Sequence, residues 1–467
     1  MAWPCTSGGV GGGWAVRERR MAVERSRRIR GRWVRAEDRG VVADRFLERV
    51  LMGADPLDLA RVQFALTAGT HFLFVALTLG LATLVALTQT RAVVSGSAVH
   101  ARMVRFWGQL YVINYAVGIV TGLVMEFQFG LNWSGLSRVT GNVFGAPLAL
   151  ETIVAFFVES TFLGLWIFGW DRLNRWVHLA LIWVVTLTAY LSAYFVLVAN
   201  GWLQRPVGFV MVDGVARLDD VGALLANPTA LLAFFHVLFG GLLTAGFFMA
   251  GVSGFHLLRR TAEVEFFRRS MRIGLLTVMV SVMPVVVFGG MQFQYAQPTK
   301  TGGHKAAAAV ADFTARFGPD DYRAPVLAGV GEALMMTMWM LMLLVAAVAL
   351  VKFPFGRWLV RGRVFHVLMI AAVPLPYVAM VAGWVFREVG RQPWMVYGVL
   401  KTRDALSPGV GAGTITVSFV AFSVLFAVLF GVNAWLLARF ARRGPEGAGL
   451  GASPPVEPAA PVMSPTF

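Results

Sequence analysis

Seven ionisable side chains in or at the end of long apolar stretches of this sequence are candidates for chemistry, because a charged group there is costly and is usually retained for function. They are His71, Glu126, Glu151, Glu159, His236, Glu332 and Glu388. Buried carboxylates can relay protons or hold an ion. A buried neutral imidazole is a good ligand of haem iron. The set therefore indicates either haem chemistry coupled to proton transfer or ion transport.

One of these stretches is also dense in methionine, with Met335, Met336, Met338, Met340 and Met342. A thioether opposite an imidazole gives a low-spin haem that transfers electrons. Met336 lies level with His236 in the predicted bundle, so this pair is a candidate ligand set. A methionine can also simply fill a gap in a helical core.

Nine apolar stretches reach the roughly 20 residues that a membrane-spanning helix needs. Open backbone cannot cross lipid, and barrel strands would alternate in polarity every second residue, so all nine are predicted to be helices. The predicted fold is an all-α membrane protein, a bundle of nine transmembrane helices. We place them near 64–90, 106–129, 146–170, 177–200, 227–258, 271–291, 325–351, 364–387 and 414–438.

The charges in the connections predict the orientation of the bundle. With 91–105 in the cytoplasm, the inner segments carry 17 Lys and Arg and the longer outer segments carry 11. The positive-inside rule then predicts an N-terminus outside and a C-terminus inside. Six of the seven ionisable groups lie near the outer face in this orientation. Glu159, eight residues beyond Glu151, points toward the middle of the bilayer.

Composition excludes several classes of protein. Of the 467 residues, 57% are hydrophobic and only 14% are charged, whereas soluble chains carry roughly 25% charged residues. The lone cysteine, Cys5, excludes disulfide frameworks, Cys-based zinc sites, iron–sulfur clusters and covalently attached haem. The net charge of +16 would suggest nucleic acid in a soluble protein, but we expect no nucleic-acid partner for a membrane bundle.

The chain divides into a terminal extension, a helical domain and a tail. Residues 1–51 hold 12 Arg and 6 acidic residues without the apolar core of a signal peptide. An Arg-rich segment is hard to export, so we expect translation to start at Met52; a disordered basic arm is the alternative. The helical domain covers 57–443. The Gly-, Pro- and Ala-rich tail, 444–467, should be disordered.

Seven motifs occur in a fixed order along the helical domain. They are RVQFALTAGTHFLFVALTLG at 61–80, TGLVMEFQFGLNW at 121–133, FGAPLALE at 144–151, FFVESTFLGL at 156–165, GWDRL at 169–173, LVANGW at 197–202 and GRQPW at 390–394. Together they resemble subunit I of the cytochrome bd-type quinol oxidases, over roughly 57–443.

The resemblance implies a terminal respiratory oxidase of the prokaryotic cytoplasmic membrane. Such an enzyme oxidises quinol, either ubiquinol or menaquinol, at the outer face and reduces dioxygen to water with protons from the cytoplasm. The resemblance implies three haems, namely low-spin haem b, high-spin haem b and haem d, although the third site could hold a b-type haem. It also implies subunit II as a partner, small single-helix subunits as further candidates, and surrounding membrane lipid.

The resemblance also implies roles for single residues. His71 looks like the ligand of a high-spin haem of the dioxygen site, His236 like a ligand of low-spin haem b, and Glu388 like the ligand of the other high-spin haem. Glu151 and Glu159 resemble the carboxylates of the dioxygen site and its proton supply. Further candidates are Glu126 for catalysis and, for binding cofactor, Arg61, Arg391 and Trp394.

Two parts depart from the family pattern. The usual setting of the second low-spin ligand, Phe-x-x-Met-Val, is missing; spacing favours Met336, with Met335 as the alternate. The loop at 292–324 is either a substrate loop or a plain connector. It keeps Gln297 and Lys300 of the quinol site, but Lys305 stands where the family has a glutamate.

Two other functions stay open from the sequence. One is a related quinol oxidase with b-type haems only, because the same ligands serve both macrocycles. The other is a haem-free ion or solute transporter, although the sequence has no inverted repeat of the kind expected there.

Overall fold

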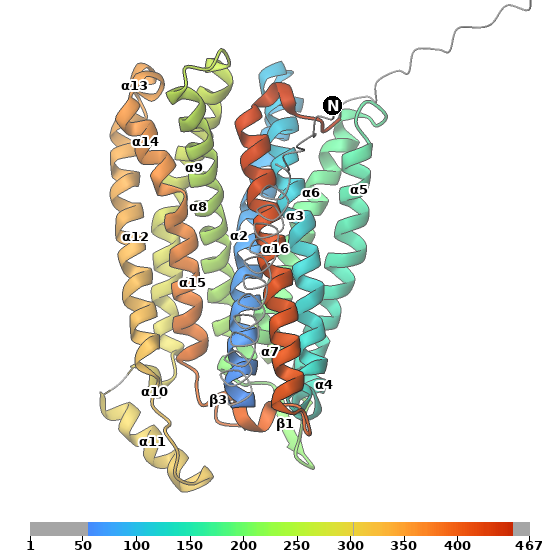
Figure 1. Ribbon diagram of the computed structural model, residues 1–467, viewed down its shortest axis with the longest axis vertical. Coiled ribbons are helices and arrows are strands. Elements are labelled where there is room, and N and C mark those ends of the chain that lie inside the picture. The colour runs from blue at the N-terminus through green and yellow to red at the C-terminus, as the bar shows by residue number, and fades with distance from the viewer. Residues whose placement is uncertain (1–54, 302, 452–467) are drawn as a thin grey trace, which may run out of the picture. The chain divides into compact units, whose positions relative to one another are not determined.

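The computed structural model describes residues 55–301 and 303–451 (Figure 1). Within these residues, nine helical spans are long and apolar enough to cross a membrane, which confirms the predicted all-α bundle. The observed helices extend beyond the predicted apolar stretches. The third span, for example, begins at Ser134 rather than at 146.

Five spans are single helices, and four are jointed. The single helices are α2 (Pro56–Ser95), α3 (Ala98–Leu131), α6 (Arg175–Gln204), α12 (Val326–Lys352) and α16 (Ala412–Arg443). The jointed spans are α4 (Ser134–Thr152), the π-helical turn η1 (Ile153–Glu159) and α5 (Ser160–Phe168); α7 (Val221–Leu225) with α8 (Pro228–Leu258); α9 (Val264–Met291) with the 3₁₀ turn η2 (Gln292–Tyr295); and α14 (Arg363–Ala372) with α15 (Pro374–Val389).

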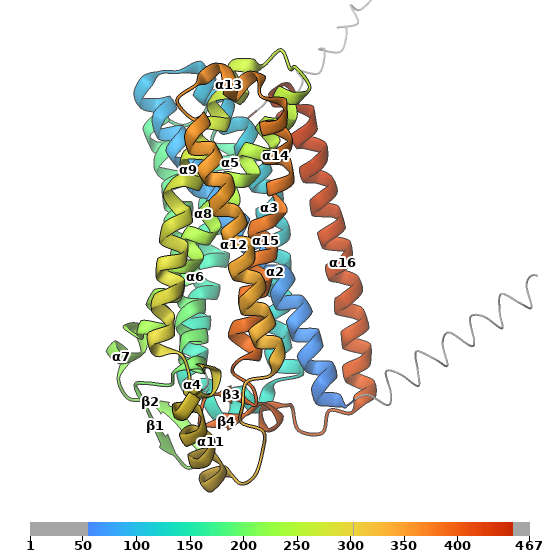
Figure 2. The ribbon, with the colours of Figure 1, turned by 90° about the vertical axis from the view of Figure 1, so that its left-hand side faces the viewer.

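Short elements fill the connections. They are the hairpin of β1 (Phe209–Val212) and β2 (Val215–Leu218), the helices α10 (Pro298–Thr301), α11 (Gly303–Phe317) and α13 (Gly356–Arg361), the antiparallel pair β3 (Trp394–Val396) and β4 (Leu400–Lys401), and the 3₁₀ turns η3 (Thr402–Ala405) and η4 (Pro445–Gly447). Figure 2 shows α11 and both strand pairs at one end of the spans and α13 at the other. The predicted loop at 292–324 is therefore largely helical.

Packing divides the chain into two units. The described part of the smaller unit is 55–60 and 410–419, the first turns of α2 and α16. In these turns Leu59 N donates to Asp55 O (3.1 Å) and Ile415 N donates to Gly411 O (3.3 Å). The larger unit, 61–409 with the residues from 420 onward, holds the core and the cavity.

The core of the larger unit is rich in aromatic side chains. Its largest fully buried members include Trp107, Trp166, Phe247, Phe266 and Phe267. They lie in the half of the bundle near the α2–α3 and α8–α9 connections, because they come early in α3 and α9 and late in α8. These aromatic side chains fill that end of the bundle.

Close helix contacts rest on glycine. A Cβ built on Gly80 of α2 would lie 2.2 Å from Gly241 O of α8, so the two backbones touch directly. Gly246 of α8 and Gly274 of α9 meet in the same way, at 2.9 and 2.8 Å. Small residues at such crossings allow the tight van der Waals contact that holds membrane helices together.

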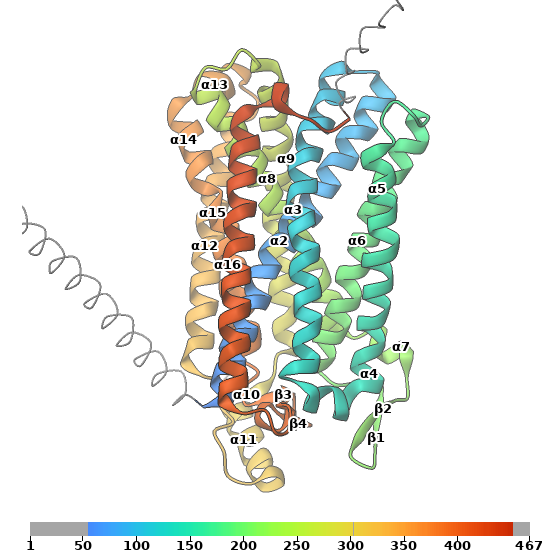
Figure 3. The same cartoon turned by 45° about the vertical axis from the view of Figure 1, so that its right-hand side comes forward.

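The chain after α16 folds back onto α3, which lies beside α16 (Figure 3). Gly449 N donates to Gln109 Oε1 (2.8 Å), Arg105 Nη1 donates to Gly451 O (3.2 Å), and Leu450 is buried. Residues 444–451 thus pack on α3, whereas the sequence predicts a disordered tail from 444. Residues 452–467, like the predicted extension 1–51, lie outside the described residues.

Candidate functional site

A cavity of about 940 Å³ occupies the half of the larger unit that the aromatic core leaves open. This size lies at the upper end for ligand-binding pockets. All seven ionisable residues that the sequence singled out line it. So do six further predicted site residues, namely Arg61, Gln297, Lys300, Met335, Met336 and Arg391.

Trp394 is the exception among the predicted site residues. It is fully buried but does not line the cavity. Its ring packs against Phe313 and Phe317 of α11, at centroid distances of 4.9 and 5.0 Å, and against Tyr322 at 5.7 Å. Trp394 therefore anchors α11 to the strand that follows Arg391, and direct contact with a cofactor in the cavity has no support.

The geometry around His71 leaves one ring nitrogen free to bind a metal. Its Nδ1 lies 2.9 Å from Thr121 Oγ1, and the Thr121 hydroxyl itself donates to the carbonyls of Val117 and Gly118. Nδ1 must then be the donor, so Nε2 carries the lone pair. Such a partner fixes the orientation of a ligating imidazole.

His236 is held in the same tautomer. Its Nδ1 donates to Val285 O at 2.7 Å, which leaves Nε2 as an acceptor. The ring lies against Gly289, where a Cβ would be 2.9 Å from the imidazole Cε1. Gly289 thus makes room for the ring between α8 and α9.

Both candidate methionines reach the cavity from α12. Met335 packs against α15, since a Cβ on Gly383 would lie 2.6 Å from its Sδ. Met336 is 37% exposed, whereas Met335 is half-buried. Burial therefore favours Met335 as a haem ligand, while the spacing of the sequence favours Met336.

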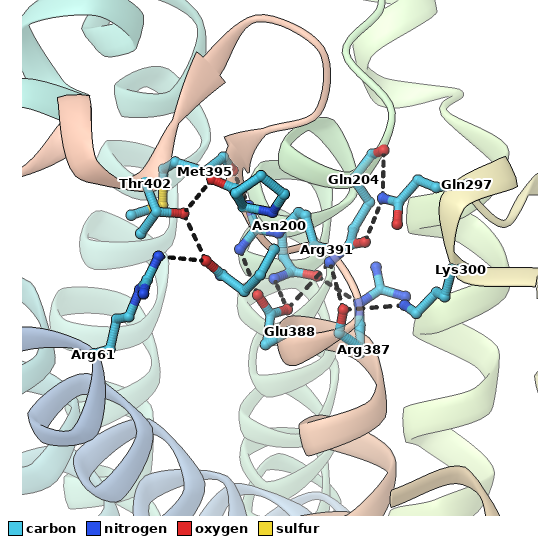
Figure 4. A network of polar contacts seen from close by, with 12 residues as sticks. Arg61, Asn200, Gln204, Gln297, Lys300, Arg387, Glu388, Arg391, Met395 and Thr402 are labelled. Atoms are coloured by element: carbon cyan, nitrogen blue, oxygen red, sulfur yellow. Dashed lines mark hydrogen bonds and ion pairs between the residues drawn. The ribbon is translucent and has the colours of Figure 1, made fainter. Parts of the chain in front are cut away.

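Glu388 is the centre of the polar network in Figure 4. Its Oε2 accepts from Arg391 Nη2 at 2.5 Å, and its Oε1 accepts from Asn200 Nδ2 at 2.8 Å and from Gln204 Nε2 at 3.4 Å. Arg391 also donates to the Met395 carbonyl. These bonds hold the carboxylate in a fixed position at the cavity wall.

Cations outnumber carboxylates in this network. Arg387 donates to Asn200 Oδ1 (2.7 Å) and Gln292 Oε1 (2.9 Å), and Arg61 donates to Gln392 Oε1 (3.1 Å). With Arg391 and Lys300, these arginines make four basic side chains around Glu388. This end of the cavity is suited to hold further anionic groups.

Lys300 enters the network from α10. Its Nζ donates to Arg387 O at 3.1 Å and lies 4.5 Å from the centre of the Phe386 ring. Burial, followed by repulsion from the Arg387 guanidinium, lowers the pKa of Lys300 to about 7. With this pKa, the Lys300 amine can exchange a proton near neutral pH. Beside Lys300 in the network, Gln297 donates to both the carbonyl and the side-chain oxygen of Gln204, at 3.0 and 2.8 Å.

Three further carboxylates, Glu126, Glu151 and Glu159, line the wall made by α3, α4 and η1. Thr152 donates to Glu126 Oε1 (3.2 Å), and Ser192 donates to Glu151 Oε1 (2.9 Å). Glu159 is buried, and the side chain of Tyr115 lies beside its carboxylate. It ends the π-helical turn η1, where the sequence predicted a regular α-helix between Glu151 and Glu159. Such π turns often occur at functional sites.

Several residues of the site were missed by sequence reasoning. Asn200, Gln204 and Arg387 hold Glu388 or its neighbours. They are polar residues at the ends of apolar stretches, so the sequence could have identified them as candidates. Thr121 and Ser192 gave none, because hydroxyl side chains are common in membrane helices and usually bond to their own backbone.

Buried polar atoms support a cofactor with carboxylate groups. Arg387 Nη2 and Arg391 Nε are buried and have no hydrogen-bond partner among the described residues. A haem brings two propionate carboxylates and an iron that needs one or two protein ligands. The two cationic donors and the free Nε2 atoms of His71 and His236 fit these requirements.

The fold and the site together define a multi-pass membrane protein with a cavity suited to haem and lined by carboxylates. The model of the family "Cytochrome bd terminal oxidase subunit I" matches residues 59–320 and 317–445. The chain belongs to this family.

Individual relatives agree with this assignment. The chain is 37% identical over 450 residues to cytochrome bd ubiquinol oxidase subunit 1 of Bacillus subtilis, covering 84% of this chain and 94% of that one. It is 30% identical over 507 residues to cytochrome bd-II ubiquinol oxidase subunit 1 of Escherichia coli, covering 84% and 97%. In the structure of bd oxidase from Geobacillus thermodenitrificans, one chain matches with a TM-score of 0.74 at 26% identity, covering 84% and 100%.

The resemblance read from the motifs is thus confirmed. The protein is a subunit of a quinol:dioxygen oxidoreductase of the respiratory chain, and its family implies haem cofactors. A haem-free transporter is not supported.

Proposed function

We propose that this chain oxidises a membrane quinol beside Lys300 and Gln297 and reduces dioxygen to water at haems that side chains of the same cavity would hold. The observation that carries the proposal is that a single cavity contains Lys300, the predicted haem ligands and three carboxylates suited to proton transfer. Electrons and protons can then move between these groups without leaving the larger unit.

The side chains divide into two ligand sets. His236 and either Met335 or Met336 would hold low-spin haem b, and His71 and Glu388 would hold the two high-spin haems, b and d. Haem iron supplies one-electron transfer and dioxygen binding when it is bound. The hydrogen bonds of Thr121 and Val285 orient the imidazoles, and Arg391 and Asn200 orient Glu388.

Proton movement would have a direction. Quinol releases protons near Lys300, at the end of the bundle predicted to face outward. Glu159, with Tyr115, and Glu151, with Ser192, would deliver protons from the cytoplasm to the dioxygen site. Uptake on one side and release on the other would build a proton gradient.

The proposal includes the setting of the enzyme. The bacterial relatives support a location in the prokaryotic cytoplasmic membrane, and their printed description as subunit 1 supports a second subunit as partner. Ubiquinol and menaquinol are both candidate substrates. Two of the relatives are named ubiquinol oxidases, and the name of a third is "Putative cytochrome bd menaquinol oxidase subunit I".

Absorption spectra and oxygen consumption of the purified complex test the proposal. We expect haem bands including the red chlorin band of haem d, and dioxygen consumption that depends on added quinol. Bands of b-type haem alone would identify the b-only oxidase. A complex without haem, or one that consumes no dioxygen with either quinol, would refute the proposed function.

A further inference from the structure

Glu332 of α12 differs from the other carboxylates of the cavity. Glu126, Glu151 and Glu388 each accept a side-chain hydrogen bond, and Glu159 is buried beside Tyr115. Glu332 is half-buried on the cavity wall and has no hydrogen bond or ion pair to another described residue. Its carboxylate is therefore available to a ligand.

Glu332 shares its part of the cavity with Lys300. Both side chains line the cavity, and both lie beside Phe386: a Cβ on Gly331, the residue before Glu332, would be 3.0 Å from Phe386 N, and Lys300 Nζ is 4.5 Å from the centre of the Phe386 ring. Lys300 reaches this space from α10, and Glu332 reaches it from α12. A basic and an acidic group thus face one compartment from two different elements.

The wall beside them is aromatic and reaches the lipid-facing surface. Lys300 lies over the Phe386 ring, and Phe386 stacks on Phe293 at 5.8 Å between centroids and 30° between planes. Phe293 and Leu327 line the cavity and are also 41% and 56% exposed. A flat apolar molecule in the bilayer therefore has a route to this compartment.

The connecting segment 292–324 lacks an equivalent carboxylate at the cavity. Asp312 lies on the surface of α11 and pairs with Arg316 at 3.4 Å, and Asp320 pairs with Lys401 at 2.7 Å. Residue 305, five positions after Lys300, is an exposed lysine. An acidic proton acceptor in this compartment must then come from outside the segment.

We propose that Glu332 is a catalytic residue of the quinol site and takes one of the two protons of the quinol, while Lys300 takes the other. This inference rests on the proposed function. In the reaction both O–H bonds of the quinol break. One proton passes to the Glu332 carboxylate and one to the neutral Lys300 amine. Two electrons leave for the haems, and the ring becomes a quinone.

Glu332→Gln tests this role, because the amide keeps the size of the side chain but cannot accept the proton. We expect kcat with a short-chain quinol to fall about a hundredfold, the low end of general acid–base effects. KM should change little. Haem spectra should be unchanged, and so should oxygen consumption with tetramethyl-p-phenylenediamine, a donor that loses electrons without releasing protons.

Two further variants sharpen the test. Glu332→Asp keeps the carboxylate and should retain more quinol activity than Glu332→Gln. Asp312→Asn removes an exposed carboxylate of α11 and should behave as wild type. If Glu332→Gln disturbs the haem content, Glu332→Asp decides: a normal haem spectrum together with a lower quinol kcat would support the role.

Wild-type quinol turnover in Glu332→Gln would overturn the inference, as would equal slowing with quinol and with the proton-free donor. Failure of the proposed function looks different. In that case the wild-type complex itself would oxidise no quinol while still consuming oxygen with the proton-free donor.

Discussion

Met335 and Met336 are adjacent on α12, and both line the cavity with His236. If one of them is the second ligand of the low-spin haem, its replacement by leucine should make that haem high-spin or lower its reduction potential, since thioether ligation raises the potential. The spacing of the sequence predicts this result for Met336→Leu and a silent Met335→Leu.

A reduced-minus-oxidised spectrum and a redox titration of the two variants measure the effect. The opposite pattern, with Met335→Leu altered and Met336→Leu silent, would agree with the greater burial of Met335. Unchanged spectra in both variants would mean that neither methionine is the ligand.

Lys300 should make quinol oxidation depend on pH. Its pKa is lowered to about 7, first by burial and then by Arg387. Below this pH the side chain is an ammonium and cannot accept a proton, so kcat/KM for quinol should rise as pH increases through about 7. Lys300→Arg keeps a charge at all these pH values and should lack the rise.

A pH profile of quinol oxidation, compared with that of the proton-free donor, checks this prediction. An identical rise in Lys300→Arg would assign the titration to another group.

At the scale of elements, the turn η1 separates Glu151 from Glu159. Eight residues of regular α-helix would place them about 12 Å apart along the axis. The π-helical turn changes the spacing of the two side chains from that of a regular α-helix. Ser192 donates to Glu151, and Tyr115 lies beside Glu159. We expect Glu159→Gln to keep the haems but slow turnover about tenfold or more, because an amide cannot relay a proton.

Glu151→Gln should also alter the high-spin haem spectrum, because Glu151 should border the dioxygen site. Turnover and spectra of the two variants, with Ser192→Ala as a test of orientation alone, measure the difference. Wild-type turnover in Glu159→Gln would remove that residue from the proton path.

The crossing of α2 and α8 makes a prediction about stability. Gly80→Ala would place a Cβ 2.2 Å from the Gly241 carbonyl, and backbone cannot yield as a flexible side chain can. Overpacking of this kind costs about 1–3 kcal/mol or more, so we expect less assembled, haem-loaded complex.

Gly69→Ala in the same helix is the matched control, because nothing lies within 4 Å of the added Cβ. Haem per membrane protein measures both variants. A normal yield of Gly80→Ala would mean that α2 and α8 can separate at this crossing without loss of the fold.

At the scale of the whole molecule, the charge distribution predicts orientation. Because the connections rich in Lys and Arg stay in the cytoplasm, Lys305 of α11 should face outward and Ser95 at the end of α2 should face inward. Both side chains are exposed. In a Cys5→Ser background, a membrane-impermeant maleimide should label Lys305→Cys in intact cells, and label Ser95→Cys only after permeabilisation. The reverse labelling pattern would mean that the bundle has the opposite orientation in the membrane.

The sequence by itself determined the membrane bundle and the residues that are candidates for chemistry. Membrane spans depend on local hydropathy, which a single stretch of residues contains. Ionisable residues inside such stretches are rare, so His71, Glu159 and His236 stood out without any knowledge of their neighbours. The ordered motifs indicated the cytochrome bd subunit I family, and the family model and the relatives confirmed it.

Only the tertiary structure decided how these residues are held. Glu388 is fixed by Asn200, nearly two hundred positions away in the chain, and Trp394 turned out to pack under α11 rather than to face the cavity. The helical connection at 303–317 and the packing of 444–451 on α3 were also absent from the local pattern. Hydropathy predicts that a helix forms, but hydrogen bonds and ring contacts between distant residues depend on which helix faces meet, and that is settled only when the whole bundle packs.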